Sequence, residues 1–213
     1  MTAIKMCGFT RLEDAQAAAS MGVHALGFVL WPGSPRCVDL QTVGRIVVGL
    51  PPFVTPVGVF VNPTADAIAR AAQEGGIRVA QVYGVVPPFA TGGAPVAILR
   101  AVHLADGAGA ELDSDVAPDV PVLLDAHDPV RHGGTGRVAD WTRAAMVARS
   151  RVVVLAGGLT PANVAAAIDT VRPYGVDVAS GVETRPGVKD PLLMRQFIDA
   201  IHKKEPASFL RDT

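Results

Sequence analysis

Short runs of apolar residues, rich in valine, isoleucine and leucine, recur along the chain and alternate with segments of helical apolar spacing. Eight of these runs predict strands, at residues 3–7, 25–30, 56–61, 77–82, 96–102, 121–125, 152–155 and 176–180. Near-continuous apolar strands are typical of parallel sheets buried on both faces, and alternating strands and helices point to the same arrangement. The pattern therefore predicts an α/β protein with a parallel sheet.

Six of the intervening segments predict helices, at residues 11–21, 40–50, 65–73, 141–149, 161–171 and 191–202. Thr10, Asp39, Thr64 and Asp140 precede four of them, and such side chains accept hydrogen bonds from the first backbone N–H groups of a helix. Residues 85–95 are rich in proline and glycine, which predicts a degraded or very short fourth helix.

Eight strand-and-crossover units in 213 residues predict a (β/α)8 TIM barrel, the closed form that eight such units adopt. The alternative is an open, doubly wound sheet, which requires a reversal of strand order that the pattern does not test. No shift in composition marks a boundary, so residues 1–213 are expected to form one barrel domain. The polar residues 204–213 predict a flexible tail.

Composition and charge limit the partners. Apolar residues make up 49% of the chain and the mean hydropathy is +0.33, yet no apolar run has the length of a membrane span. The net charge is −1 and there is no long basic block, so we expect neither a nucleic-acid partner nor a membrane. The only two cysteines, Cys7 and Cys37, and the lack of a secretory pattern at the N-terminus predict a reducing, cytoplasmic location.

Functional groups of barrel enzymes gather at the carboxyl ends of the strands. Cys7 ends the first predicted strand, where a deprotonated thiol can act as a nucleophile or base; the alternative is an inert core cysteine. Arg36 follows the second strand, in a loop stiffened by Pro32 and Pro35. A guanidinium held in this way suits bidentate carboxylate recognition, whereas the alternative is a solvated arginine whose stem packs on Trp31.

Asp125 ends the sixth predicted strand and is a candidate general acid, with a structural turn role as the alternative. The glycines of residues 133–136, Gly134 among them, would let the following loop approach a ligand with exposed N–H groups. Two more glycine-bearing loops follow the last two strands, where many barrels bind phosphate; ordinary turns are the alternative. Their glycines are Gly157, Gly158 and Gly181, the last preceded by Ser180.

Cofactors are not expected. The five histidines lack the paired spacing of a zinc site, and no nucleotide-binding glycine pattern occurs between a strand and a helix. An acid–base reaction on an anionic small molecule is therefore the chemistry that the candidate residues favour.

Taken together, these motifs resemble the phosphoribosylanthranilate isomerase family of tryptophan biosynthesis. The resemblance covers nearly the whole chain in the family's order. The matching segments are residues 5–11, 34–36, 57–62, 123–125, 133–136, 140–141, 156–159, 175–183, 186–187 and 189–190.

The resemblance implies a cofactor-free Amadori rearrangement of a phosphoribosyl anthranilate. Asp125 would be the general acid that opens the sugar ring, and Cys7 the general base that removes the C2′ proton. Arg36 would bind the anthranilate carboxylate, and Gln81, at the end of the fourth strand, would contact the substrate. The glycine loops described above would hold the phosphate, and the loop of Gly134 would contribute to binding.

This chain departs from the family pattern at three places. Tyr83 stands where the family usually carries a histidine, Ala139 replaces a bulky aromatic residue, and residues 85–95 replace a normal fourth helix. Two other functions stay open: a histidine-pathway phosphoribosyl aminoaldose isomerase or dual-substrate relative, and a phosphate-ligand-binding barrel without catalysis. Whether the chain is a monomer or a homodimer is also left open.

Overall fold

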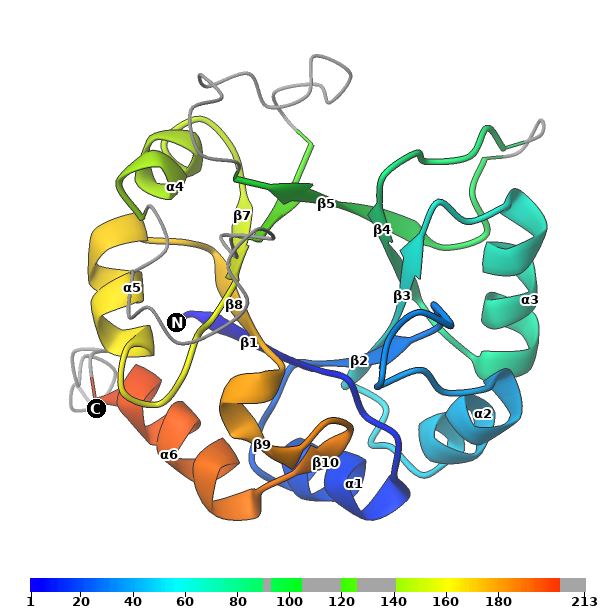
Figure 1. Ribbon diagram of the computed structural model, residues 1–213, viewed down its shortest axis with the longest axis horizontal. Helices are drawn as coiled ribbons and strands as arrows, with labels where there is room; N and C mark the ends of the chain where they lie inside the picture. The colour runs from blue at the N-terminus through cyan, green and yellow to red at the C-terminus, as the bar shows by residue number, and fades with distance from the viewer. Residues whose placement is uncertain (90–92, 105–119, 126–140, 204–213) are drawn as a thin grey trace, which may run out of the picture.

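The computed structural model describes residues 1–89, 93–104, 120–125 and 141–203, and its strands close into a barrel (Figure 1). Every neighbouring pair is parallel, and β1 pairs with both β2 and β8. The predicted (β/α)8 barrel is therefore confirmed, and the open doubly wound alternative is wrong. The strands are β1 Ala3–Cys7, β2 Ala25–Val29, β3 Thr55–Val61, β4 Val79–Tyr83, β5 Ala97–His103, β6 Val122–Asp125, β7 Val153–Ala156 and β8 Gly175–Val178.

Helices surround the barrel on its outside (Figure 1). α6 shows why: Met194, Phe197, Ile198 and Ile201 are buried, and their spacing places one apolar stripe against the strands. Of residues 85–95, the described ones contain no helix, as the proline- and glycine-rich composition predicts. The described helices are α1 Leu12–Ser20, α2 Leu40–Val48, α3 Ala65–Gly75, α4 Trp141–Ala148, α5 Val164–Val171 and α6 Pro191–His202.

The helix starts follow the predicted caps in two cases and not in a third. Asp39 accepts a hydrogen bond from the Thr42 N–H, and Thr64 accepts one from the Ala67 N–H. The prediction for Thr10 is wrong, because α1 begins without a side-chain cap and the Thr10 hydroxyl donates instead to the Gly187 carbonyl. The predicted cap Asp140 lies outside the described residues.

The chain after β8 differs from the prediction of a strand up to residue 180. β8 ends at Val178, and Ser180–Val182 form a short 3-10 helix, η1. A hairpin follows, in which β9 (Glu183–Arg185) pairs antiparallel with β10 (Val188–Lys189). The predicted helix at 161–171 also begins later, because the Asn163 side chain accepts a hydrogen bond from the Thr160 N–H and holds the preceding turn.

The alternation along each strand sorts apolar from polar side chains. Ile4 and Met6 of β1 belong to the main core cluster that includes the helices' buried residues. The intervening residues face the barrel interior, where a small apolar cluster joins Ala101, Leu123 and Ala156. Because successive side chains point to opposite faces, Lys5, Cys7, Gln81, Tyr83, Asp125 and Asp177 also face the interior.

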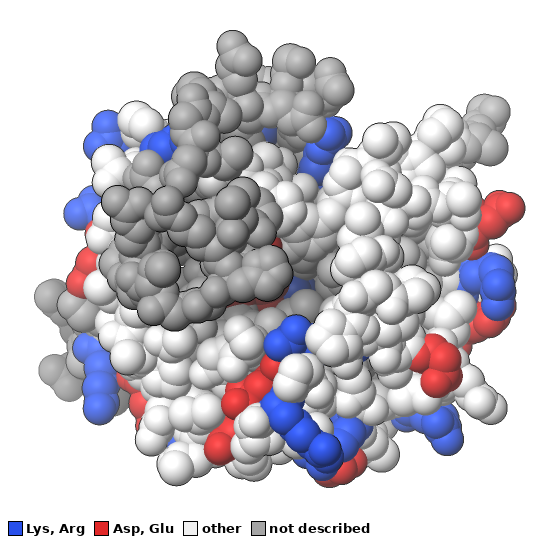
Figure 2. Space-filling model, in the orientation of Figure 1, with Lys and Arg blue, Asp and Glu red and all other residues white. Residues whose placement is uncertain are grey.

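None of the described helices combines the length and the apolar character needed to cross a membrane. On the face shown in Figure 2, side chains of both charges gather over α1, β9 and β10, whereas the surface over β3 and β4 is largely uncharged.

Candidate active site

The two predicted proton-transfer residues end their strands at the same rim of the barrel. Cys7 is the last residue of β1 and Asp125 is the last residue of β6. Both side chains face the barrel interior from the carboxyl ends of their strands. The hydroxyl of Tyr83, the last residue of β4, donates to Asp125 Oδ2 at 3.1 Å.

Tyr83 supplies a neutral hydrogen-bond donor beside Asp125. Burial and the neighbouring Asp125 carboxylate raise the pKa of the Tyr83 hydroxyl far above its ordinary value, so it keeps its proton. The hydroxyl is thereby fixed as a donor toward Asp125. Tyr83 thus makes a polar contact to the predicted acid.

The environment of Cys7 makes the thiol the dominant form. Burial raises its pKa, while the ammonium groups of Lys5 and Lys189 work in the opposite direction. Lys5 forms a buried ion pair with Asp177 at 2.9 Å, across the β1–β8 seam. Although burial opposes it, the Asp177 carboxylate raises the pKa of Lys5, so the ammonium stays charged beside the thiol.

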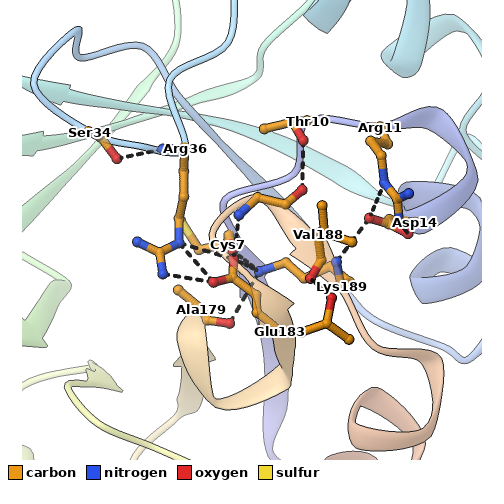
Figure 3. Close-up of polar contacts among 12 residues, drawn as sticks. Cys7, Thr10, Arg11, Asp14, Ser34, Arg36, Ala179, Glu183, Val188 and Lys189 are labelled. Atoms are coloured by element: carbon orange, nitrogen blue, oxygen red, sulfur yellow. Dashed lines mark hydrogen bonds and ion pairs between the residues drawn. The ribbon is translucent and has the colours of Figure 1, made fainter. Parts of the chain in front are cut away.

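Arg36 does bind a carboxylate with two nitrogens, but it is that of Glu183 (Figure 3). Nε lies 3.0 Å from each Glu183 oxygen and Nη2 lies 2.7 Å from Oε2. The stem crosses Gly8, where a Cβ atom would lie 2.6 Å from Arg36 Cδ and where φ is +86°. Only glycine fits there, so the first loop is shaped to let Arg36 reach the site.

Glu183 and Lys189 are site residues to which the sequence reasoning gave no role. Lys189 Nζ donates to Glu183 Oε1 at 2.8 Å, and also to the carbonyls of Cys7 and Ala179. Although burial acts against it, hydrogen bonds from Arg36 and Lys189 lower the pKa of Glu183. The local signal was a charged residue in each strand of a short hairpin, but the contacts of this pair with Arg36 and Cys7 join residues far apart along the sequence.

The two predicted phosphate loops touch one another. Gly157 and Gly158 adopt φ values of +97° and +64°, and Asn163 Nδ2 donates to the Gly158 carbonyl at 3.0 Å. A Cβ atom at Gly181 would lie only 2.0 Å from the Leu159 carbonyl oxygen. The loop after β7 therefore contacts the loop holding Ser180 and Gly181, as expected for two parts of one binding site.

Of the remaining predicted positions, Gln81 lies within the described residues and Gly134 does not. Gln81 is buried on β4 and its Nε2 donates to the Tyr83 hydroxyl at 3.4 Å. Gln81 Oε1 and Asp177 Oδ1 are buried with no hydrogen-bond partner in the described part of the chain. Gly134 and Ala139 lie outside the described residues. Within the described ranges, no group of three or more His, Cys, Asp or Glu could hold a metal ion.

The fold and site define the chain as a (β/α)8 barrel with groups for acid–base chemistry on an anionic ligand, gathered where such barrels carry their active sites. Residues 4–200 match the family described as N-(5'phosphoribosyl)anthranilate (PRA) isomerase, and the chain belongs to this family. The resemblance found in the sequence is thereby confirmed.

Individual relatives agree with this assignment. The N-(5'-phosphoribosyl)anthranilate isomerase of Pelobacter propionicus is 42% identical over 198 residues, covering 93% of this chain and 94% of the relative. The crystal structure of the Thermus thermophilus phosphoribosyl anthranilate isomerase has a TM-score of 0.81 at 34% identity, covering 96% of this chain and all of that one. A further isomerase structure, in complex with reduced 1-(o-carboxyphenylamino)-1-deoxyribulose 5-phosphate, has a TM-score of 0.78 at 35% identity, covering 95% and 100%.

Proposed function

We propose that this chain converts N-(5-phosphoribosyl)anthranilate into 1-(2-carboxyphenylamino)-1-deoxyribulose 5-phosphate, the isomerisation step of tryptophan biosynthesis. The observation that carries the proposal is the family match over residues 4–200, together with Cys7 and Asp125 at the carboxyl ends of β1 and β6, where both face the barrel interior. The two free cysteines, Cys7 and Cys37, further suggest that the reaction takes place in a reducing cytoplasm.

The rearrangement needs one acid and one base. Asp125 protonates the ring oxygen of the sugar, and the ring opens to a Schiff base with the anthranilate nitrogen. Cys7, as the thiolate, then removes the proton from C2′, and the iminium group takes up the electron pair to give an enolamine. Tautomerisation of the enolamine gives the ketose product, so the protons balance and no metal or redox group is required by the chemistry.

Binding uses the groups around the rim. Arg36 attracts the anthranilate carboxylate, and the loops of Gly157, Gly158, Ser180 and Gly181 hold the phosphate with backbone N–H groups. Gln81 Oε1 and Asp177 Oδ1 are buried acceptors without partners in the described part of the chain, and hydroxyl groups of the open sugar would satisfy them. The loop of Gly134 contributes the remaining contacts in this proposal.

Turnover assays with the anthranilate substrate and with the histidine-pathway aminoaldose test this function. We expect activity on the anthranilate compound, and a loss of at least about 100-fold in kcat for Cys7→Ser and for Asp125→Asn, because each removes one proton-transfer group. Both variants should still bind the product.

The matched control is Cys37→Ser, which removes the exposed cysteine and should leave kcat unchanged. Activity on the histidine-pathway compound alone would contradict the proposal. Tight product binding by the wild-type chain without turnover would instead identify a non-catalytic binding barrel.

A further inference from the structure

The pairing of Arg36 with Glu183 reduces the positive charge that Arg36 can offer to a ligand. An arginine already bound to a carboxylate forms a neutral pair, and a neutral pair attracts a second carboxylate only weakly. The side chain of Glu183 is 3% exposed and that of Arg36 is 21% exposed, so water screens this pair only in part. If Arg36 binds the substrate carboxylate, another group must restore the positive charge.

The geometry of the guanidinium leaves room for a second carboxylate. Glu183 occupies the edge formed by Nε and Nη2. A guanidinium has five N–H donors in a planar fork, and the edge formed by Nη1 and the second Nη2 proton can bind another carboxylate bidentately. Within the described residues, Nη1 makes no hydrogen bond. Glu183 therefore holds the planar group in one orientation without using the whole of it.

Lys189 supplies the missing charge. Its side chain is 0% exposed, and its Nζ donates to three oxygens, those of Cys7, Ala179 and Glu183. An ammonium group has three N–H donors, whereas a neutral amine has two, so three acceptors match the charged form. Arg36, Glu183 and Lys189 then carry one net positive charge. The nearby Lys5 and Asp177 pair with each other and add none.

Lys189 is itself fixed from several directions. Its backbone N–H donates to Asp14 Oδ2 at 3.0 Å, and Asp14 is paired with Arg11 on the first turn of α1. Its Nζ also lies 5.3 Å from the centre of the Phe9 ring. Figure 3 shows the carboxylate of Glu183 between the guanidinium group of Arg36 and the ammonium group of Lys189. The position of the charge is thus set by the hairpin and by α1 together.

We propose that Glu183 and Lys189 are positioning residues of the subsite for the aryl carboxylate of the substrate. Glu183 orients Arg36 with its second edge toward the ligand, and Lys189 cancels the charge of Glu183, so that the trio presents one net positive charge. This inference rests on the proposed function, since it assigns the carboxylate to Arg36. It extends that function by stating what makes Arg36 able to discriminate a carboxylate-bearing ligand from one without it.

The test compares two ligands by titration calorimetry: reduced 1-(2-carboxyphenylamino)-1-deoxyribulose 5-phosphate and the same compound with phenyl in place of carboxyphenyl. The ratio of their Kd values measures the preference for the carboxylate. We expect Lys189→Met to reduce this preference about tenfold or more, the size of one lost charged contact. The Kd of the phenyl ligand should change little.

A double variant separates charge from structural damage. Lys189→Met with Glu183→Gln leaves Arg36 as the only charge of the trio, so the net charge returns to +1 and the preference should recover. If the single Lys189→Met variant does not fold, Glu183→Gln alone, with a net charge of +2, is compared with the double variant. The preference should then be greater in Glu183→Gln than in the double variant.

Three results would overturn the proposal: equal weakening of both ligands in Lys189→Met, a preference in the double variant below that of the single variant, or equal preferences in Glu183→Gln and the double variant. Failure of the proposed function is seen separately. If the wild-type chain prefers the carboxylate ligand but does not turn over the anthranilate substrate, the proposed function is contradicted and the proposed subsite is not.

Discussion

Cys7 illustrates how the chemistry of one residue depends on neighbours from distant parts of the chain. Its position could be predicted because it ends an apolar run, and the same holds for Asp125, whereas Arg36 was found in the proline-bearing loop that follows the second strand. The distant residues that surround Cys7 and Arg36 in the folded chain could not be predicted. Lys189 lies 182 residues from Cys7, and Glu183 lies 147 residues from Arg36. Pairs at such separations are created by closing the barrel, and no local pattern in the sequence reports them.

The thiol of Cys7 should titrate above the ordinary range of cysteine. Burial raises its pKa, so the thiolate fraction in the folded chain is below that of an exposed cysteine at the same pH. We expect the rate of iodoacetamide alkylation in a Cys37→Ser background to increase with pH, with a midpoint above that of a free cysteine peptide. The value of kcat/KM should increase over the same range.

The control for this titration is the same protein saturated with product, in which alkylation should be suppressed because the ligand covers the thiol. A midpoint at or below that of the peptide would contradict the assigned environment of Cys7.

Among the elements, prediction succeeded where the information is local. α2 and α3 begin at their predicted caps, because a cap side chain and the backbone N–H that donates to it are only three residues apart. Thr10 failed as a cap because its partner, Gly187, belongs to the hairpin that follows β8. The predicted end of β8 at residue 180 was also wrong, because the strand ends at Val178 and the chain turns into η1 from Ser180.

The contact between the loops after β7 and β8 gives an element-scale prediction. In Gly181→Ala, the new Cβ atom would lie 2.0 Å from the Leu159 carbonyl oxygen, so one of the two loops must move. Since both loops are assigned to phosphate binding, we expect KM to rise about tenfold and the free energy of unfolding to fall by about 1–3 kcal/mol, as for other overpacked sites. Steady-state kinetics and chemical denaturation measure the two effects.

Gly22→Ala is the matched control, because Gly22 has a positive φ but no atom within 4 Å of the added Cβ. It should lose about 1 kcal/mol through backbone strain and leave KM unchanged. An unchanged KM in Gly181→Ala would mean that these loops do not shape the phosphate site.

At the scale of the whole molecule, eight repeated units sufficed to predict closure into a barrel, because a parallel sheet of eight such units has few other ways to bury both faces. We infer that residues 1–213 form one domain. The hydrogen bonds between β1 and β8 join the first barrel strand to the last, so strands cannot separate from one another without opening the ring. A closed ring of this kind favours cooperative unfolding.

The two tryptophans test this cooperativity. Trp31 lies between β2 and α2 and is 43% exposed, whereas Trp141 begins α4 and is 9% exposed. In Trp31→Phe and in Trp141→Phe, denaturation followed by the remaining tryptophan should coincide with that followed by far-UV circular dichroism. Separate midpoints in either variant would show that the two halves of the barrel unfold independently.

The Lys189 ammonium group, which donates to Cys7, Ala179 and Glu183, also constrains how this barrel can change its substrate. Replacing Arg36 alone with a neutral residue leaves Glu183 paired only with Lys189. Replacing Glu183 alone leaves the cations Arg36 and Lys189 without the carboxylate between them. A change at residue 36, 183 or 189 therefore calls for matching changes at the other two. A redesign for an aminosugar without an acidic ring must replace all three at once.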